Sequence, residues 1–218
     1  MTDAGRENLS RLGAIAMVIA FVALSIRLAQ SYQQLADWIV YGGAAVFIAV
    51  LTAAAFAAPG SIWKRLERPI ALVIVAIAFL LNSFKLAIIV GTLMSAPQTL
   101  RPLPLFQTSV VLWFANILVF TLAYWLIDAG GPQRRETRTT TRPDFDFAAR
   151  SDPSKLGPGW QPSIVDYLFI AFTTNTSFGP TEAMPLTARA KSLMILQSFV
   201  SLVTIAGVAA RAIGATGQ

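Results

Sequence analysis

The sequence predicts an all-α membrane protein with five transmembrane helices and a re-entrant segment between the fourth and the fifth. Hydrophobic residues make up 55% of the 218 residues and charged residues only 13%, whereas a soluble domain carries about a quarter. The apolar residues stand in continuous uncharged blocks, which favours helices over the alternating strands of a membrane barrel. One further apolar block is too short to span a bilayer and runs into a hydroxyl-rich stretch, which indicates the re-entrant segment.

Residue types that are missing limit the chemistry. The chain has no Cys and no His, which excludes disulfides, thiolate nucleophiles, typical zinc sites and imidazole catalysis. Its eleven acids include no pair placed for acid–base work, and no G-x-S-x-G signature is present. We therefore expect neither an enzyme nor a cofactor. The net charge of +6 is typical of basic loops beside membrane helices, so no nucleic-acid partner is expected.

Residues 1–101 are predicted to form a three-helix N-terminal membrane region. The uncharged blocks place its helices at 12–28, 38–58 and 69–94. Lys85 is an intramembrane charge near the middle of the third block, and such a residue is a functional hypothesis by default. It is explained by coupling to a proton or substrate, or by snorkelling and bonding to neighbouring carbonyl groups, and the second explanation is favoured.

Residues 102–218 are predicted to form a pore-like module. Its parts are an outer helix at 103–127, a polar loop at 128–162, a re-entrant segment at 163–187 and an inner helix at 188–213. Tyr124 and Trp125 near the end of the outer helix are typical of an interfacial aromatic belt. The loop is rich in Gly, Pro, Thr and Arg, so we expect it to be exposed.

The re-entrant segment is predicted from its length and its composition. Ser163 and Asp166 have the spacing of a capping box, so a short helix is expected to begin there. The apolar stretch 164–172 is about half as long as the roughly 20 residues that a membrane helix needs. Residues 173–177 are small and polar, and the Gly-Pro pair at 179–180 breaks any helix. The chain is therefore expected to turn and return to the same face of the membrane.

The residues after this turn resemble the pore module of the tetrameric potassium-channel superfamily. That family has a filter reading roughly T-T-V-G-Y-G-D, followed by Pro, Thr and an Arg that opens the inner helix. The matching positions need no gap and are Thr176, Ser177, Phe178, Gly179, Pro180, Thr181 and Glu182, then Pro185, Thr187 and Arg189. The resemblance implies a homo-tetramer, a filter and pore lining at residues 176–182, and monovalent cations bound in the pore.

This stretch also departs from the family filter. Ser177 and Gly179 keep a hydroxyl and the first filter glycine, but Pro180 and Thr181 replace the Tyr and the second Gly. Because Pro fixes φ and Thr resists positive φ, at least one ring of carbonyl groups is expected to be lost. Weak discrimination between potassium and sodium follows. Glu182 is either one of a ring of carboxylates that concentrates cations or a solvated loop acid.

A second resemblance concerns the junction before the loop. Residues 128–132 read DAGGP and residues 166–173 read DYLFIAFT. This D-x-G-G-P junction followed by D-Y-L-x-x-x-F-T is similar to an uncharacterised family of bacterial membrane proteins. The likeness implies a bacterial inner membrane location and implies no activity.

The inner helix carries a mostly polar stripe at helical spacing. Its members are Gln197, Ser201, Thr204, Val208 and Arg211. They are explained either as a water-facing pore lining or as polar groups that bond neighbouring helices. Val208 interrupts the polar face, so the second interpretation is favoured.

The distribution of Lys and Arg predicts a cytoplasmic N-terminus. With that orientation only Arg27, Arg101 and Arg211 fall on the outer side. The inner side then holds Arg6, Arg11, Lys64, Arg65, Arg68, the six bases of the polar loop, Arg189 and Lys191. The re-entrant segment would enter from the cytoplasm, opposite to potassium channels and similar to ionotropic glutamate receptors.

These patterns together favour an oligomeric, cation-permeable membrane pore. Its expected partners are further copies of the same chain, membrane lipids and permeating ions. The alternatives are a small membrane transporter that uses Lys85 and a non-conducting membrane scaffold with a pore-module fold.

Overall fold

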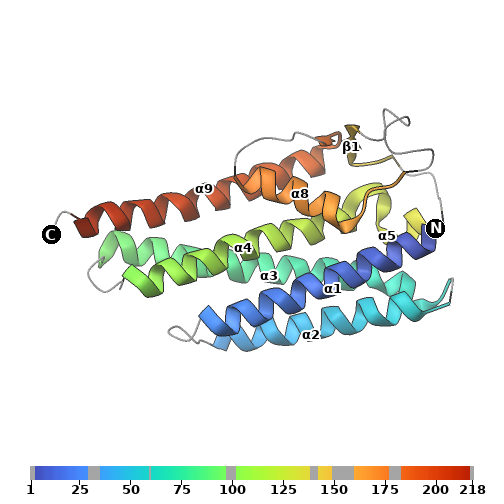
Figure 1. Cartoon of the computed structure of the whole chain (residues 1–218), viewed down its shortest axis with the longest axis horizontal. Coiled ribbons are helices and arrows are strands. Elements are labelled where there is room, and N and C mark those ends of the chain that lie inside the picture. The colour runs from blue at the N-terminus through green and yellow to red at the C-terminus, as the bar shows by residue number, and fades with distance from the viewer. Residues whose placement is uncertain are drawn as a thin grey trace.

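The computed structural model describes residues 3–28, 35–58, 60–96, 102–137, 142–148, 160–176 and 183–216. Long helices run lengthwise beside one another, with the N-terminus at one end of the molecule and the C-terminus at the other (Figure 1). The long helices are α1 (Asp3–Leu28), α2 (Leu35–Phe56), α3 (Ile62–Ser95), α4 (Pro102–Ile127) and α9 (Ala188–Thr216). We call the end that holds the start of α1 the N-terminal end.

The shorter elements lie between α4 and α9 in the sequence. They are a 3-10 turn (Asp128–Gly130), α5 (Pro132–Glu136), β1 (Phe145–Phe147), α8 (Ile164–Asn175) and β2 (Ala183–Pro185). The two strands pair antiparallel, with Phe145 opposite Pro185 and Phe147 opposite Ala183. This small sheet lies at the N-terminal end, where α9 begins (Figure 1).

Three helices in the described part of the chain are long and apolar enough to cross a membrane. They are Ile62–Ser95, Leu103–Gly130 and Ala188–Gly207, and their length and hydropathy fit a membrane protein. The apolar helices Tyr41–Phe56 and Ile164–Asn175 are shorter. Many large apolar side chains point outward from these helices, for example Leu80, Phe84 and Phe199 at about 60% exposure.

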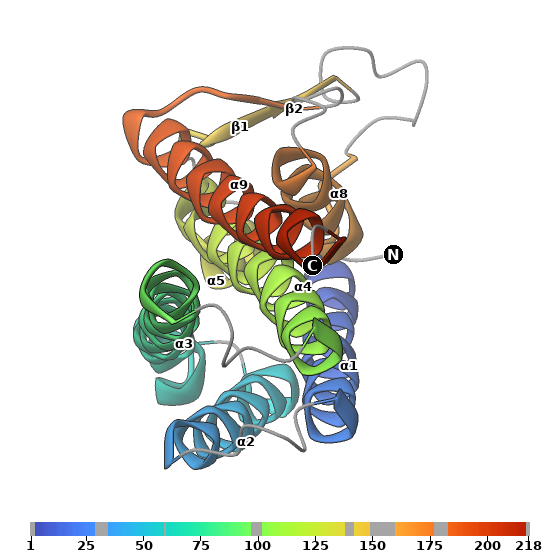
Figure 2. The same cartoon turned by 90° about the vertical axis from the view of Figure 1, so that its left-hand side faces the viewer.

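Helix α4 is the central helix of the bundle. In its most apolar stretch 72% of the residues are buried, compared with 17% in α3 and 33% in α9. Viewed from one end, α4 lies among α1, α3 and α9, with α2 on the far side of α1 and α3 (Figure 2). Most of its buried apolar residues belong to one core cluster that extends from Ala14 of α1 to Met194 of α9, and Leu112 packs in a second, smaller cluster with Leu86 and Val200. The core therefore joins both predicted regions of the chain.

Two helices begin earlier than the uncharged blocks indicate. The stretches 12–28 and 69–94 that were predicted to span the membrane lie within longer helices, because α1 begins at Asp3 and α3 begins at Ile62. Helix α3 runs through Pro69 without ending. The buried charges Glu7, Arg11, Lys64 and Glu67 in these first turns are paired in the folded chain, as described below, so the helices continue beyond the apolar blocks.

Helix α8 begins beside the C-terminal end of α4, and the chain comes back to that same end after α8. The Tyr167 hydroxyl in its first turns donates to Asp128 at 2.7 Å, and the last residue, Asn175, accepts from Asn116 at 2.6 Å. The two partners, Asp128 and Asn116, are twelve residues apart, which is about 18 Å of helix. After residues 177–182 the chain is back at the N-terminal end, where β2 pairs with β1.

Candidate functional site

Polar side chains from three helices meet where α8 ends. This amide cluster consists of Asn116 and Tyr124 on α4, Asn175 on α8, and Gln197 and Ser201 on α9. All five side chains are at most 1% exposed. A buried polar group without a partner costs free energy, so this depth is tolerated only because the groups bond to one another.

Gln197 is the centre of the amide cluster. Its carbonyl oxygen accepts from the Tyr124 hydroxyl at 2.6 Å, and its amide group donates to the Ala171 carbonyl of α8 at 2.7 Å. Its backbone carbonyl accepts from Asn116 at 3.2 Å. One side chain therefore ties α9 to both α4 and α8.

The last turn of α8 is held by hydrogen bonds to its C-terminal groups. Ser201 donates to the backbone carbonyl of Asn175 at 2.6 Å, which occupies one of the carbonyls that a helix end leaves free. Asn116 donates to the Asn175 side chain, and its own Oδ1 is buried with no partner among the described residues. The end of α8 is thus fixed in position, and Asn116 of α4 presents an unpaired acceptor oxygen beside it.

Most of the predicted filter lies outside the described residues. This applies to Ser177, Phe178, Gly179, Pro180, Thr181 and Glu182. Thr176 is described, and its hydroxyl donates back to the carbonyl groups of Phe172 and Thr173 at the end of α8. The capping box predicted at Ser163 and Asp166 is confirmed, because both of its reciprocal hydrogen bonds are present.

The described members of the inner-helix stripe face the interior of the chain. Gln197, Ser201 and Thr204 are at most 5% exposed. The first two bond to α8, and the Thr204 hydroxyl donates to the Val200 carbonyl of its own helix. The contacts of Gln197 and Ser201 are those of polar groups that bond neighbouring helices. The side chains of Val208 and Arg211 lie outside the described residues.

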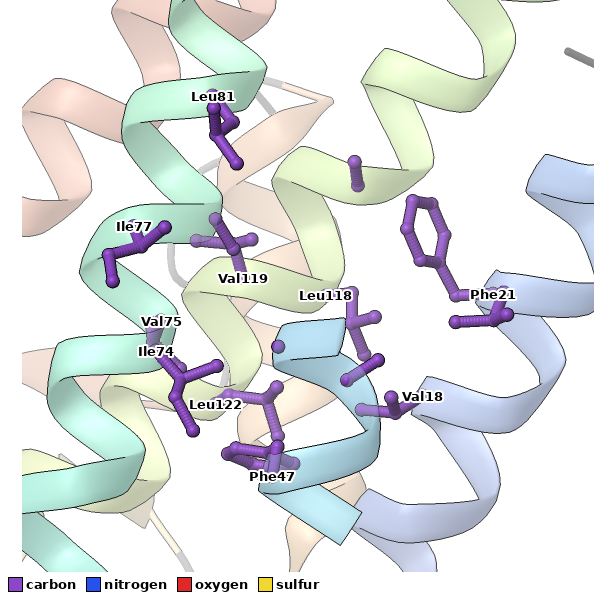
Figure 3. Close-up of a pocket in the computed structure, with 15 residues that line it drawn as sticks. Val18, Phe21, Phe47, Ile74, Val75, Ile77, Leu81, Leu118, Val119 and Leu122 are labelled. Atoms are coloured by element: carbon purple, nitrogen blue, oxygen red, sulfur yellow. The ribbon is translucent and has the colours of Figure 1, made fainter. Parts of the chain in front are cut away.

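Lys85 lies on α3, and an apolar cavity lies between α4 and the three helices of the N-terminal region. Lys85 is half-buried on α3, one turn after the buried Asn82. A cavity of about 220 Å³ opens among α1, α2, α3 and α4, and Phe21, Phe47 and Leu118 point into it (Figure 3). Every residue that lines it is apolar or glycine, so this cavity offers no group to bind an ion or a polar substrate.

A second polar layer closes the N-terminal end of the bundle. Arg11 of α1 forms a two-point ion pair with Glu67 of α3, with N–O distances of 2.6 and 2.8 Å. Glu136 of α5 accepts from both Arg11 at 2.5 Å and Lys64 at 2.8 Å. These four side chains are at most 6% exposed, so three separate helices are joined by buried charges.

Arg135 of α5 is a further buried cation of this layer. It pairs with Glu7 at 2.6 Å and donates to the backbone carbonyls of Trp125 and Asp128 at the end of α4. Burial by itself lowers the pKa of the Arg135 guanidinium, but the phenolic oxygen of Tyr167 and the Glu7 carboxylate raise it, and the net pKa lies above its ordinary value. Arg135 therefore stays charged.

Two aspartates organise the start of α8 and α9. Asp128 accepts from the Tyr167 hydroxyl and from the backbone N–H groups of Asp144 and Phe145. Asp144 is fully buried and pairs with Arg189 through both carboxylate oxygens at 2.5 Å, and it also accepts from Thr187. Thr187 and Arg189, which the family resemblance singled out, are thus bound to the turn before β1.

Sequence reasoning missed this ionic layer. It counted Arg11 and Lys64 only as bases that indicate orientation. A local signal was present, because Glu7 and Arg11 stand four residues apart on one helix face, and Lys64 and Glu67 stand three apart. Among the described residues no group of three or more acidic side chains is arranged to bind a metal ion. Each carboxylate named above is occupied by a cation or by hydrogen-bond donors.

Comparison of the chain with protein-family models, with curated proteins and with solved structures finds no match. Its function is therefore inferred from its own residues.

Proposed function

We propose that this chain is the subunit of a homo-oligomeric, cation-permeable membrane pore, with four copies around an axis that passes near residues 176–182. The observation that carries the proposal is the arrangement of α8. It is a short helix that enters the bundle beside the end of α4, ends at the amide cluster and is followed by a return to the same end.

The length of α8 supports a re-entrant segment. Its 12 residues extend about 18 Å, well short of the roughly 30 Å hydrocarbon core of a bilayer. Irregular backbone at membrane depth is tolerated where it is buried in protein or lines a water-filled path. The stretch after Asn175 meets this condition if further copies of the chain surround it.

The electrostatics of α8 favour a cation. The C-terminus of a helix carries partial negative charge, and the amide cluster holds this end in a fixed position. A monovalent cation at the pore axis would face this end of α8 from each subunit. In the same proposal Glu182 adds a carboxylate from each copy, and Pro180 and Thr181 account for weak discrimination between potassium and sodium.

The orientation and the membrane follow from the basic residues. In the proposal α1 and α2 also cross the bilayer, which makes five crossings, and the N-terminal end faces the cytoplasm of a bacterial cell. Arg65, Arg134 and Lys191 are exposed at this end, which agrees with the rule that cytoplasmic segments carry the excess of Lys and Arg.

Ion flux tests the proposal directly. Purified protein in liposomes is given matched potassium, sodium and chloride gradients, and the flux of each ion is followed separately. We expect potassium and sodium flux at similar rates, a lower cation flux in Glu182→Gln, and no change in Asp152→Asn, an acid of the polar loop. High potassium selectivity would contradict the weakened filter. Chloride flux without cation flux would reject a cation pore. No flux of any ion would favour the alternative, a non-conducting membrane scaffold.

Oligomeric state tests the same proposal without any ion. One short helix cannot enclose an axis alone, so we expect a fourfold particle in native mass spectrometry from mild detergent and from nanodiscs. A monomer in both media would overturn the pore.

A further inference from the structure

Two arginines from distant helices reach the same end of α4. Arg68 of α3 donates from Nε to the Leu126 carbonyl at 3.0 Å, and Arg189 of α9 donates from Nη2 to the Ile127 carbonyl at 3.4 Å. These carbonyl groups belong to consecutive residues. The two guanidinium groups therefore lie close together, although they are 121 positions apart in the sequence.

A third arginine joins them through the turn that follows α4. Gly130 and Gly131 adopt φ of +81° and +94°, a conformation that favours glycine. A Cβ on Gly131 would lie 2.8 Å from Cδ of Arg68, and a Cβ on Gly130 would lie 2.5 Å from Cδ of Arg134. The side chains of Arg68 and Arg134 thus lie directly over the backbone of adjacent residues. We call Arg68, Arg134 and Arg189 the arginine patch.

The arginine patch carries more positive charge than its neighbours neutralise. Arg189 pairs with Asp144, but Arg68 and Arg134 have no carboxylate at ion-pair distance within the described part of the chain. This differs from the buried layer nearby, where Arg11, Lys64 and Arg135 each have an acidic partner. The patch is also accessible, because Arg134 is exposed, Arg68 is half-buried and the Arg189 side chain is 52% exposed.

We propose that the arginine patch binds the phosphate of an anionic phospholipid headgroup. Guanidinium groups match phosphate oxygens in geometry as well as charge. The patch lies where α3 and α9 begin and α4 ends, which is the level of the headgroups if these helices cross a bilayer. Basic pockets between membrane helices on the cytoplasmic side are suited to acidic headgroups.

A bound headgroup would connect parts of the chain that the proposed pore needs to hold together. It would bridge α3, from the N-terminal region, to α5 and to the first turn of α9. The inference rests on the membrane location and not on ion conduction, so it stands or falls separately from the pore.

Lipid retention measured by native mass spectrometry tests this site. Full-length protein in detergent is mixed with phosphatidylglycerol or phosphatidylcholine at equal concentration. The lipid that stays bound when the detergent is removed in the mass spectrometer is then measured. We expect preferential retention of phosphatidylglycerol by the wild type. The double variant R68Q/R134Q should weaken it by roughly fivefold per arginine, about 25-fold in all. The control R65Q/K191Q removes the same charge from exposed bases of α3 and α9 outside the patch, and it should retain the lipid as the wild type does.

Several outcomes would overturn the proposal. Equal losses in R68Q/R134Q and R65Q/K191Q would mean that general surface charge attracts the lipid. Displacement of the lipid by millimolar inorganic phosphate or glycerol phosphate would mean that the patch binds a soluble anion and not a lipid. If the double variant does not fold, Arg134→Gln alone changes only an exposed side chain and should still reduce retention about fivefold. Unchanged retention in that variant would reject the site.

Discussion

At the scale of single residues, burial separates arginines that look alike in the sequence. Arg134 and Arg135 are neighbours in α5, yet Arg134 is exposed and Arg135 is 5% exposed. Arg135 has Glu7, two backbone carbonyl groups and the ring of Trp125 around it. Forming a buried ion pair contributes little net stability, but removing one partner leaves an uncompensated buried charge. The two residues should therefore respond very differently to the same substitution.

The substitution Arg135→Gln should reduce the free energy of unfolding by about 3 to 5 kcal/mol, because Glu7 is left buried and unpaired. Arg134→Gln is the matched control and should be close to neutral. Thermal unfolding in detergent, followed by circular dichroism, measures both. The double variant E7Q/R135Q should lose less than the sum of the single variants, because no orphan charge remains. Equal stability of the two arginine variants would show that the Glu7 pair is not formed.

At the scale of elements, a glycine controls how α1 approaches the start of α8. A Cβ on Gly13 would lie 2.7 Å from Cγ2 of Ile164, a buried methyl group close to the α8 backbone. Real Cβ contacts are longer, so the helices would have to separate. Gly91 in α3 is also helical, and a Cβ there would meet nothing within 4 Å. Comparing alanine substitutions at Gly13 and Gly91 therefore separates the effect of helix packing from the effect of helix propensity.

The substitution Gly13→Ala should destabilise the protein by about 1 to 3 kcal/mol, the usual cost of overpacking. Gly91→Ala should stabilise it by up to about 1 kcal/mol, because alanine is the better helix former. Both are read from the midpoint of thermal unfolding in the same detergent. The loss caused by Gly13→Ala should shrink in an Ile164→Ala background, since the clashing methyl group is gone. Similar effects at Gly13 and Gly91 would argue against close contact of α1 with α8.

At the scale of the whole molecule, the buried ion pairs and the arginine patch gather at one end. The paired charges of α1, α3 and α5 and the arginine patch all lie at the N-terminal end, around the end of α4. The other end holds the ends of α3 and α9 and the start of α4 (Figure 1). This separation is what an asymmetric membrane environment demands of a protein with crossing helices.

Single cysteines introduced into this cysteine-free chain report the orientation. Ala4→Cys and Thr137→Cys lie exposed at the N-terminal end, and Ser95→Cys is exposed at the opposite end. In intact cells an impermeant thiol reagent should label Cys at position 95 and neither of the other two. All three should react after permeabilisation, which controls for accessibility. Labelling at positions 4 and 137 in intact cells would reverse the proposed topology.

The long helices were largely predictable, because each apolar block must be helical in a membrane. The predicted helices at 38–58, 103–127 and 188–213 correspond to α2, α4 and α9 with small differences at their ends. The starts of α1 and α3 were not predicted, since an uncharged block ends at the first charged residue. Charges such as Arg11 and Glu67 are compatible with these positions only because they meet each other. The strands β1 and β2 were also missed, because three-residue strands carry no periodic signal.

The sequence by itself determined that the chain is helical and apolar, and that a capped short helix follows Ser163. It also determined that Lys and Arg are concentrated in the segments at one end of the long helices. These properties depend on local composition and on spacing within a few residues, so they are visible before folding. Only the tertiary structure decided which polar groups meet. Glu7 and Arg135 are 128 positions apart, and Asn116 and Gln197 are 81 apart. Such pairs form because the packing of α4 against α1, α8 and α9 removes water from both partners, and no pattern along the chain records that packing.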